Sequence, residues 1–183
     1  MKKILAFGAS SSRKSINKQL ATYAANSVNE AEVTILDLND FEMPIFSIDK
    51  EVEQGVPQLA LDFKNHLKNS DGIVVSFAEH NGAYSAAFKN IMDWISRIEK
   101  DTWASKPMLL LATSPGAQGG STVLNIAVNK FGFMNSAEIN SFSLPSFHVN
   151  FNNEIGVIDH NLDAQFQTAL SKFSDAVLAK IKA

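Results

Sequence analysis

The sequence predicts an α/β fold in which a five-stranded parallel sheet lies between two layers of helices. Short continuous apolar runs alternate along the 183-residue chain with segments whose apolar residues recur at helical spacing. Such alternation indicates right-handed βαβ units and therefore parallel strands. No internal repeat or change of composition divides the chain, so we expect a single domain over residues 1–183. Five strands suit the order 2-1-3-4-5 better than the six-stranded dinucleotide order.

The first half of the chain contains three of the expected strands. They are short apolar runs at residues 4–7 and 73–77 and an alternating segment at residues 31–38. Helical spacing of apolar residues predicts helices between them, at about 15–29 and 58–68. Residues 39–57 have no clear period and contain two prolines and a glycine. We expect a long excursion there, and long ordered loops in compact domains are often functional.

The clearest expected helix follows the third strand. Its apolar residues step by four and three along one side, and they are Tyr84, Phe88, Ile91, Ile95 and Ile98. Two further apolar runs predict strands at 108–113 and 137–144, with a helix over about 121–133 between them. A last helical stripe is made of Leu162, Phe166, Leu170, Phe173, Val177 and Ile181.

The composition excludes several classes of function. A net charge of −3 provides no broad positive field for nucleic acid or an anionic membrane. The chain has no cysteine, so thiolate chemistry and disulfides are excluded and redox chemistry would need a cofactor. No apolar stretch reaches the roughly 18 residues of a membrane span, and the first run breaks at Gly8, short of a signal sequence. We expect a cytoplasmic protein that binds neither nucleic acid, membrane nor metal.

Three segments with little core character follow the first, third and fourth expected strands. They are residues 8–17, 78–84 and 113–121. In a doubly wound sheet, ligands bind outside the carboxyl ends of the strands, where the helices change faces, here between the first and third strands. The expected order, that of a flavodoxin-like three-layer α/β/α sandwich, places the three loops side by side. We therefore expect the ligand site at this edge.

The first loop has the composition of an anion site. It carries four serine hydroxyls together with Arg13 and Lys14, and it runs directly into a helix whose N-terminal N–H groups favour negative charge. A phosphate monoester fits this pattern, although an ordinary helix-capping serine in a solvated loop would produce it too. Neither Gly-x-x-x-x-Gly-Lys nor Gly-x-Gly-x-x-Gly occurs, which favours a mononucleotide over a dinucleotide.

The second and third loops each allow two interpretations. Asn81 and Gly82 tolerate unusual backbone angles, so main-chain donors of the second loop could face a flat heterocycle, or the loop could be a simple strand-to-helix turn. Gly116, Gly119 and Gly120 could let the third loop approach a ring or a second nucleotide, or they could form only a flexible connection.

Three motifs carry a resemblance over about residues 2–135. They are Gly8-Ala9-Ser10 through Ser15-Ile16-Asn17, then Glu79-His80-Asn81-Gly82 followed by Phe88-Lys89-Asn90-Ile91-Met92-Asp93-Trp94, then Ser114-Pro115-Gly116 with Gly119-Gly120. In this order and spacing the chain resembles the NADPH-dependent FMN reductase family, which includes quinone, azo-dye and chromate reductases.

The resemblance implies which residues hold the cofactor. The phosphate of FMN would be held by Ser10, Ser12, Arg13, Ser15, Ile16 and Asn17. The isoalloxazine ring would be lined, chiefly by backbone N–H groups, along Ala78, Glu79, His80, Asn81 and Gly82, with Ser114 and Gly116 in the third loop. Ala78 replaces a proline of the family pattern, His80 replaces a tyrosine, and the arginine sits one position later than in many members. His80 would stack on the ring, alter the electronic properties of the ring, or be an ordinary surface residue.

The implied function is that of an FMN-dependent NAD(P)H oxidoreductase. A hydride from NADPH or NADH would pass through the flavin to a small acceptor such as a quinone, free flavin or azo compound, so no catalytic side chain is required. Two alternatives stay open: an FMN-containing electron carrier, which the mild charge disfavours, and a flavin-free binding or regulatory protein. The family also implies a homodimer or homotetramer, with residues 145–153 and 43–46 either forming an interface or packing in the core.

Overall fold

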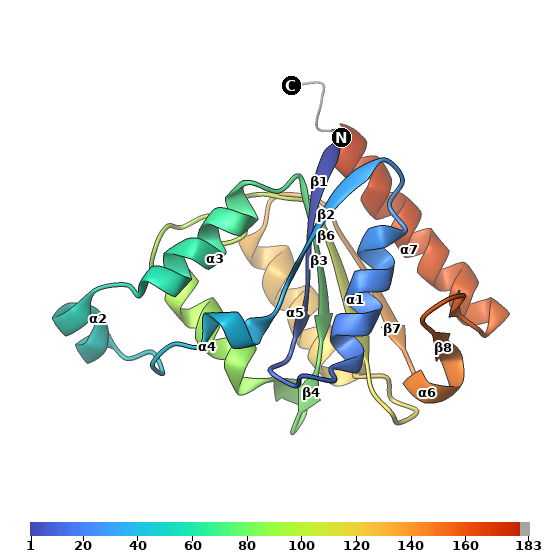
Figure 1. The fold of residues 1–183 in the computed structure, drawn as a ribbon, viewed down its shortest axis with the longest axis horizontal. Helices are drawn as coiled ribbons and strands as arrows, with labels where there is room; N and C mark the ends of the chain where they lie inside the picture. The colour runs from blue at the N-terminus through green and yellow to red at the C-terminus, as the bar shows by residue number, and fades with distance from the viewer. Residues whose placement is uncertain (180–183) are drawn as a thin grey trace.

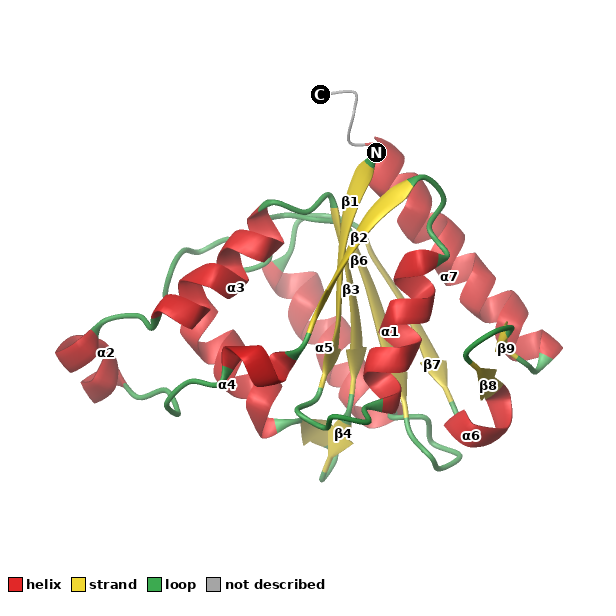
Figure 2. Ribbon diagram, viewed as in Figure 1, coloured by secondary structure: helices red, strands yellow, loops and turns green. Residues whose placement is uncertain are grey.

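The computed structural model describes residues 1–179 and confirms the predicted parallel sheet (Figures 1 and 2). Its strands are β1 (Lys2–Ala9), β2 (Ala31–Leu36), β3 (Gly72–Phe77), β6 (Met108–Thr113) and β7 (Ile139–Leu144). They lie in the order β2-β1-β3-β6-β7, and each neighbouring pair is parallel. Counted along the chain, this is the expected order 2-1-3-4-5.

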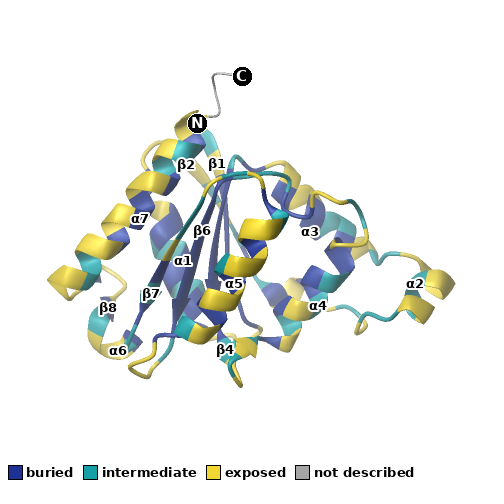
Figure 3. Cartoon of the chain, turned by 180° about the vertical axis from the view of Figure 1, so that it is seen from behind, coloured by how far each residue is buried: buried dark blue, intermediate teal, exposed yellow. Residues whose placement is uncertain are grey.

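Helices cover both faces of the sheet. α1 (Ile16–Asn26) and α7 (His160–Ala179) lie on one face, and α3 (Gln58–Lys68), α4 (Ala86–Ile95) and α5 (Ser121–Met134) lie on the other (Figure 1). Because side chains alternate along a strand, Leu5 and Phe7 of β1 pack under α3 and α4, whereas Ile4 and Ala6 pack under α1 and α7. The three central strands, β1, β3 and β6, are therefore buried on both sides (Figure 3), which explains why they occur in the sequence as continuous apolar runs. The edge strands β2 and β7 are only partly buried.

The excursion after β2 contains helical turns that the sequence did not predict. A short 3-10 helix, η1 (Leu38–Phe41), is followed by α2 (Ile48–Gln54), which has no buried residue. α2 projects from the body of the molecule (Figure 3). A helix without a buried face needs no apolar period, and Ile48 and Val52 are accordingly 60% and 81% exposed.

The segment after β3 differs from the prediction as well. The helix expected from Tyr84 begins at Ala86, because Tyr84 belongs to a hairpin of β4 (Glu79–His80) and β5 (Ala83–Tyr84). Asn81 and Gly82 form its turn with φ angles of 52° and 74°. Positive φ at both residues of a two-residue loop defines a type I′ turn, for which Asn-Gly is the favoured sequence. The dipeptide Asn81-Gly82 was therefore the feature of the sequence that could have predicted this hairpin.

A buried lysine holds the long connection between α4 and β6. Lys64 of α3 is 2% exposed, and its ammonium group donates hydrogen bonds to the carbonyls of Asp101 and Thr102. It also pairs with Glu99 at 2.8 Å. Lys68, one helical turn further along α3, reaches the same carboxylate at 3.2 Å but is half exposed. The hydrogen bond from Lys64 lowers the pKa of Glu99.

The chain after β7 returns to cover the α1 face. A helical turn, α6 (Phe147–Asn150), and a hairpin of β8 (Phe151–Asn152) and β9 (Gly156–Val157) lead into α7. Four residues of the predicted stripe are buried, namely Phe166, Leu170, Phe173 and Val177, whereas Ile181 lies outside the described residues. Within residues 1–179, no helix is long and apolar enough to cross a membrane.

Candidate functional site

The three predicted loops meet at the carboxyl edge of the sheet, the lower edge in Figure 1. Ser85, the N-cap of α4, donates its hydroxyl to the carbonyl of Ala9 at 2.8 Å, which ties the hairpin region to the end of β1. Asn17 at the start of α1 reaches Thr113 at the end of β6. The edge is therefore a connected structure that contains all three loops.

The first loop, residues 10–15, is positioned by a close approach of α1 to β1. A Cβ atom on Gly8 would lie 2.4 Å from the backbone nitrogen of Lys18. Glycine is thus required for the first turn of α1 to rest on the end of β1. Ser15 caps the helix by accepting a hydrogen bond from the N–H of Lys18 at 3.1 Å. The positive end of α1 consequently points toward the first loop.

The donor set of the first loop suits a phosphate. Ser10 is buried and accepts the N–H of Ser12 at 3.1 Å, which shapes the loop, while residues 11–14 are exposed. The first-turn N–H groups of Ile16 and Asn17 have no carbonyl partner within an α-helix. No carboxylate occurs in residues 8–17. Neutral hydroxyls, free helix N–H groups and the charge of Arg13 fit the terminal phosphate of FMN.

Asn17 has a different role from the one that the family resemblance suggested. Its side chain is 3% exposed, and its amide nitrogen donates to the carbonyl of Thr113 at 3.1 Å. Its amide oxygen accepts the hydroxyl of Ser76 at 2.7 Å and the N–H of Thr113 at 3.1 Å. Both ends of the amide are bonded inside the protein, so only the backbone N–H of Asn17 faces the loop as a donor.

The sequence interpretation missed Ser76 as part of the site, and it gave Thr113 no role beyond its place at the start of the third loop. Ser76 interrupts the apolar run Ile73–Phe77, and a hydroxyl in a strand buried on both faces requires a partner. This polar residue within an apolar run was the one feature of the sequence that could have indicated the role of Ser76. Together Asn17, Ser76 and Thr113 fasten the start of α1 to the ends of β3 and β6, and thus fix the first loop relative to the other two.

The hairpin is held by one of its faces. Glu79 accepts the N–H of Val123 at 3.0 Å and so supplies the side-chain cap that Gly120, at the N-terminus of α5, cannot provide. His80 pairs with Ala83 across the hairpin and therefore lies on the opposite face, where it is exposed. The backbone of residues 79–82 is thus anchored beside the first loop, and Ala78 is buried at its start.

Tyr84 lies on the same hairpin face as Glu79. Its ring packs against Phe77 and Phe88, with centroid distances of 5.6 and 5.3 Å. Burial raises the pKa of Tyr84 to about 12. Its hydroxyl is buried and has no hydrogen-bond partner among the described residues. This face of the hairpin belongs to the core and leaves the other face for a ligand.

The third loop is an ordered connection. Gly119 and Gly120 have φ angles of 58° and 72°, and a Cβ atom on Gly119 would lie 2.6 Å from the hydroxyl of Ser143. The carbonyls of Ser114 and Gly116 accept N–H groups of residues 147 and 146 at 3.0 and 2.9 Å. These hydrogen bonds tie the third loop to the segment that follows β7.

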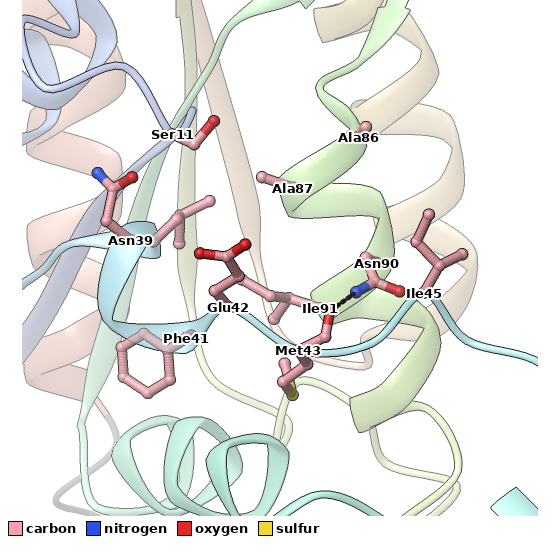
Figure 4. Close-up of a pocket in the computed structure, with 11 residues that line it drawn as sticks. Ser11, Asn39, Phe41, Glu42, Met43, Ile45, Ala86, Ala87, Asn90 and Ile91 are labelled. Carbon is pink, nitrogen blue, oxygen red and sulfur yellow. Dashed lines mark hydrogen bonds between the residues drawn. The ribbon is translucent and has the colours of Figure 1, made fainter. Parts of the chain in front are cut away.

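A groove of about 380 Å³ opens beside the first loop (Figure 4). We call it the side groove; it lies between Ser11, the excursion from Leu38 to Ile45, and the first turns of α4. The sequence interpretation assigned no residue to it, because its walls come from the excursion that lacks a period. On the other side of the loop, Arg13 and Lys14 line a depression along α1. There Lys18 pairs with Asp37 at 2.6 Å, and this hydrogen bond lowers the pKa of Asp37.

The fold defines a flavodoxin-like protein, and its serine-rich first loop lies at the switch point of the sheet. Residues 2–149 match the family model described as NADPH-dependent FMN reductase. The chain belongs to this family, as the sequence motifs predicted.

Several characterised proteins are similar to this chain. The quinone reductase of Escherichia coli (strain K12) is 30% identical over 80 residues, which cover 44% of this chain and 43% of the relative. The 2-hydroxy-1,4-benzoquinone reductase of a Burkholderia species is 31% identical over 108 residues, which cover 58% and 57%. The matches thus span about half the length of these curated relatives.

A solved structure shows the shared fold over nearly the whole chain. The flavoenzyme NAD(P)H:(acceptor) oxidoreductase from Paracoccus denitrificans superimposes with a TM-score of 0.76 and 22% identity, and the match covers 98% of each chain.

Proposed function

We propose that this chain binds FMN and transfers electrons from NADPH or NADH to a small acceptor such as a quinone, free flavin or azo compound. The observation that carries the proposal is the carboxylate-free first loop, aimed by α1 at the edge where the hairpin and the third loop also lie. With a quinone as acceptor, a hydride equivalent from NAD(P)H and one proton from water would give NAD(P)⁺ and the hydroquinone.

Different residues of the edge would bind the phosphate and the ring of FMN. The hydroxyl of Ser12, the N–H groups of Ile16 and Asn17 and the charge of Arg13 would hold the phosphate. The hairpin N–H groups at residues 79–82 would orient the ring, with Ser114 and Gly116 bordering it. Bound FMN supplies the hydride and electron transfer, so no side chain has to serve as nucleophile, acid or base.

Comparison of FMN with riboflavin tests the phosphate site, because riboflavin lacks only the phosphate. We expect fluorescence titration of the purified protein to give FMN an affinity at least about tenfold higher than riboflavin. Ser12→Asp places a negative charge in the loop and should remove most of this difference. Asn26→Asp adds the same charge at the exposed far end of α1 and should preserve it. Equal affinity of the wild type for both flavins would contradict the proposed site.

Reduction experiments separate the enzyme from its alternatives. We expect anaerobic NADPH or NADH to bleach the bound flavin, and menadione to restore its colour over many cycles. A protein that binds FMN but is reduced by neither nicotinamide would be an electron carrier. A protein that binds no FMN would be the flavin-free binding protein.

We further propose a homodimer whose interface includes the excursion. Ile45, Ile48 and Val52 are 77%, 60% and 81% exposed, an unusual concentration of apolar surface. Phe147 and Phe151, in contrast, are buried and stack with centroids 4.8 Å apart, so they pack in the core. The two segments that the sequence suggested as one interface lie at opposite ends of the molecule (Figure 1).

Light scattering after gel filtration tests this interface. Val52→Glu should give a monomer, while Val149→Glu, at a residue that is 72% exposed near α6, should leave the dimer intact. An unchanged mass for Val52→Glu would refute the assignment. Assembly into tetramers and a cytoplasmic location stay predictions from the sequence.

A further inference from the structure

The hairpin of β4 and β5 has a free face with one large polar side chain. His80 and Ala83 are paired across the hairpin, and both are exposed. Glu79 and Tyr84 form the other pair, and their side chains contact α5 and the aromatic core instead. Side chains alternate between the two faces of a strand, so His80 and Ala83 point away from the core. Because Ala83 contributes only a methyl group, the imidazole of His80 dominates the free face.

The imidazole of His80 has no partner within the protein. Among residues 1–179 it makes no hydrogen bond, ion pair or ring contact. A neutral imidazole offers one donor and one acceptor nitrogen, and the protonated form offers two donors and a positive charge. All of this capacity is available to a ligand.

The free face belongs to the segment proposed to orient the isoalloxazine ring. The backbone of residues 79–82 is fixed on both sides, since Glu79 accepts an N–H of α5 and Ser85 donates to the end of β1. The hairpin cannot turn its other face to a ligand, because that face is packed on the core. A ring held by the hairpin N–H groups would therefore lie beside the imidazole of His80.

The other charged or titratable groups of the surrounding segments differ from His80 in their behaviour. They belong to Arg13, Lys14, Glu79, Tyr84, Lys89 and Asp93. Glu79 and Tyr84 face the core, and Lys89 and Asp93 pair with each other on α4 at 2.6 Å. The two cations of the first loop are of residue types that keep their charge over the range in which histidine loses it. The third loop and the first half of α5 contain no charged side chain.

We propose that His80 links the reduction potential of bound FMN to pH. Histidine changes its charge between pH 5 and 8, and a flavin that accepts a hydride from a nicotinamide gains one negative charge. Cationic His80 therefore stabilises reduced FMN relative to oxidised FMN, whereas neutral His80 does not. The family pattern has a tyrosine at this position, which stays neutral over this range. The inference rests on the proposed function and adds a positioning residue that sets the potential.

The expected effect follows from one pair of opposite charges in contact with water. Such a pair changes an equilibrium about fivefold. At pH 6.5 histidine is only partly protonated, so we expect a two- to fivefold preference for reduced FMN, which equals about 9–20 mV for a two-electron couple. At pH 8.5 the preference should vanish because histidine is neutral. In stronger acid it should also decrease, because the reduced flavin itself takes up a proton.

The potential of the FMN-loaded protein, measured against a reference dye at pH 6.5 and 8.5, tests the proposal. The wild type should exceed His80→Gln by about 9–20 mV at pH 6.5 and equal it at pH 8.5. His80→Arg carries a permanent positive charge and should exceed His80→Gln at both pH values. The control is His66→Gln, at an exposed residue beside the first residues of β1 and thus near the opposite edge of the sheet, and it should follow the wild type.

Nuclear magnetic resonance gives a second readout that needs no turnover. Coupling between two sites is reciprocal, so reduction of bound FMN should raise the pH at which the ring signals of His80 titrate by about 0.3–0.7 pH unit, the logarithm of the same factor. The titration of His66 should not move. The inference is overturned if the wild type and His80→Gln have equal potentials at pH 6.5, or if their difference persists at pH 8.5, as a purely structural role would require. Failure of the proposed function would appear separately, as a wild type that elutes from gel filtration without FMN, and it would contradict both proposals.

Discussion

Replacing Asn17 with alanine should loosen the whole ligand edge. The substitution removes three hydrogen bonds at a residue that is 3% exposed. It takes the amide of Asn17 away from the N–H and carbonyl of Thr113 and from the hydroxyl of Ser76. A typical hydrogen bond contributes about 1 kcal/mol net, so we expect the free energy of unfolding to fall by about 3 kcal/mol. For a protein of this size, this corresponds to a decrease in Tm of about 6–12 °C.

Urea unfolding of the wild type and three variants measures this effect. Ser76→Ala removes one of the three hydrogen bonds and should cost about 1 kcal/mol. Asn26→Ala, at an exposed position of the same helix, should change the free energy of unfolding by less than about 0.5 kcal/mol. Asn17→Ala should also weaken FMN binding, because the first turn of α1 loses its attachment to β6.

The comparison between Asn17→Ala and Asn26→Ala decides whether the reasoning is right. If both variants unfold at the same urea concentration as the wild type, the hydrogen bonds of Asn17 contribute nothing net. A large loss of stability with unchanged FMN affinity would show instead that Asn17 supports the sheet without positioning the first loop.

Four other substitutions test the energetic arguments in thermal or urea unfolding. Lys64→Met should cost about 2 kcal/mol because buried carbonyls lose their donor, whereas Lys68→Met at the half-exposed position should cost at most about 0.5 kcal/mol. Tyr84→Phe removes an unpartnered buried hydroxyl and should stabilise the protein by about 1 kcal/mol below pH 10. Because burial raises the pKa of Tyr84 to about 12, the wild type should lose further stability as pH rises from about 10 toward 12, whereas Tyr84→Phe should not, so the advantage of the variant should grow with pH. The pKa of Asp37 is lowered, so its contribution is present above the usual carboxyl pKa and is lost in acid: Asp37→Asn should cost up to about 1 kcal/mol at neutral pH, and the difference should vanish as pH falls.

Much of the fold could be predicted because strands buried on both faces must be continuously apolar. The runs around Phe7, Val75 and Leu110 are visible without any knowledge of their partners. The hairpin was missed although Asn81-Gly82 is its favoured turn, since the apolar step from Tyr84 to Phe88 imitates the start of a helix. Tyr84 in fact belongs to the hairpin and is partly buried, and the hydroxyl of Ser85 caps the first turn of α4.

The parts of the site that escaped prediction depend on contacts between distant residues. Asn17 and Thr113 are 96 positions apart, and no local pattern announces their hydrogen bonds. The tie between Glu79 and Val123 likewise spans 44 positions. The excursion packs on α4 through a few isolated contacts, such as the ring of Phe46 against Trp94, so neither periodicity nor a motif marks the residues of the side groove. The sequence could locate the loops, whereas only the three-dimensional arrangement shows which side chains fasten them.

The segment of the chain that matches the family model is shorter than the segment needed to complete the hydrophobic core. The family match ends at residue 149, before α7 begins at His160. Yet α7 contributes Phe166 and Phe173, both fully buried, to the cover of one face of the sheet. A truncated polypeptide ending at 149 would retain every residue assigned to FMN and leave that apolar face bare, so we expect it to aggregate. Recognition of a ligand and the ability to fold are thus encoded in overlapping but unequal lengths of this chain.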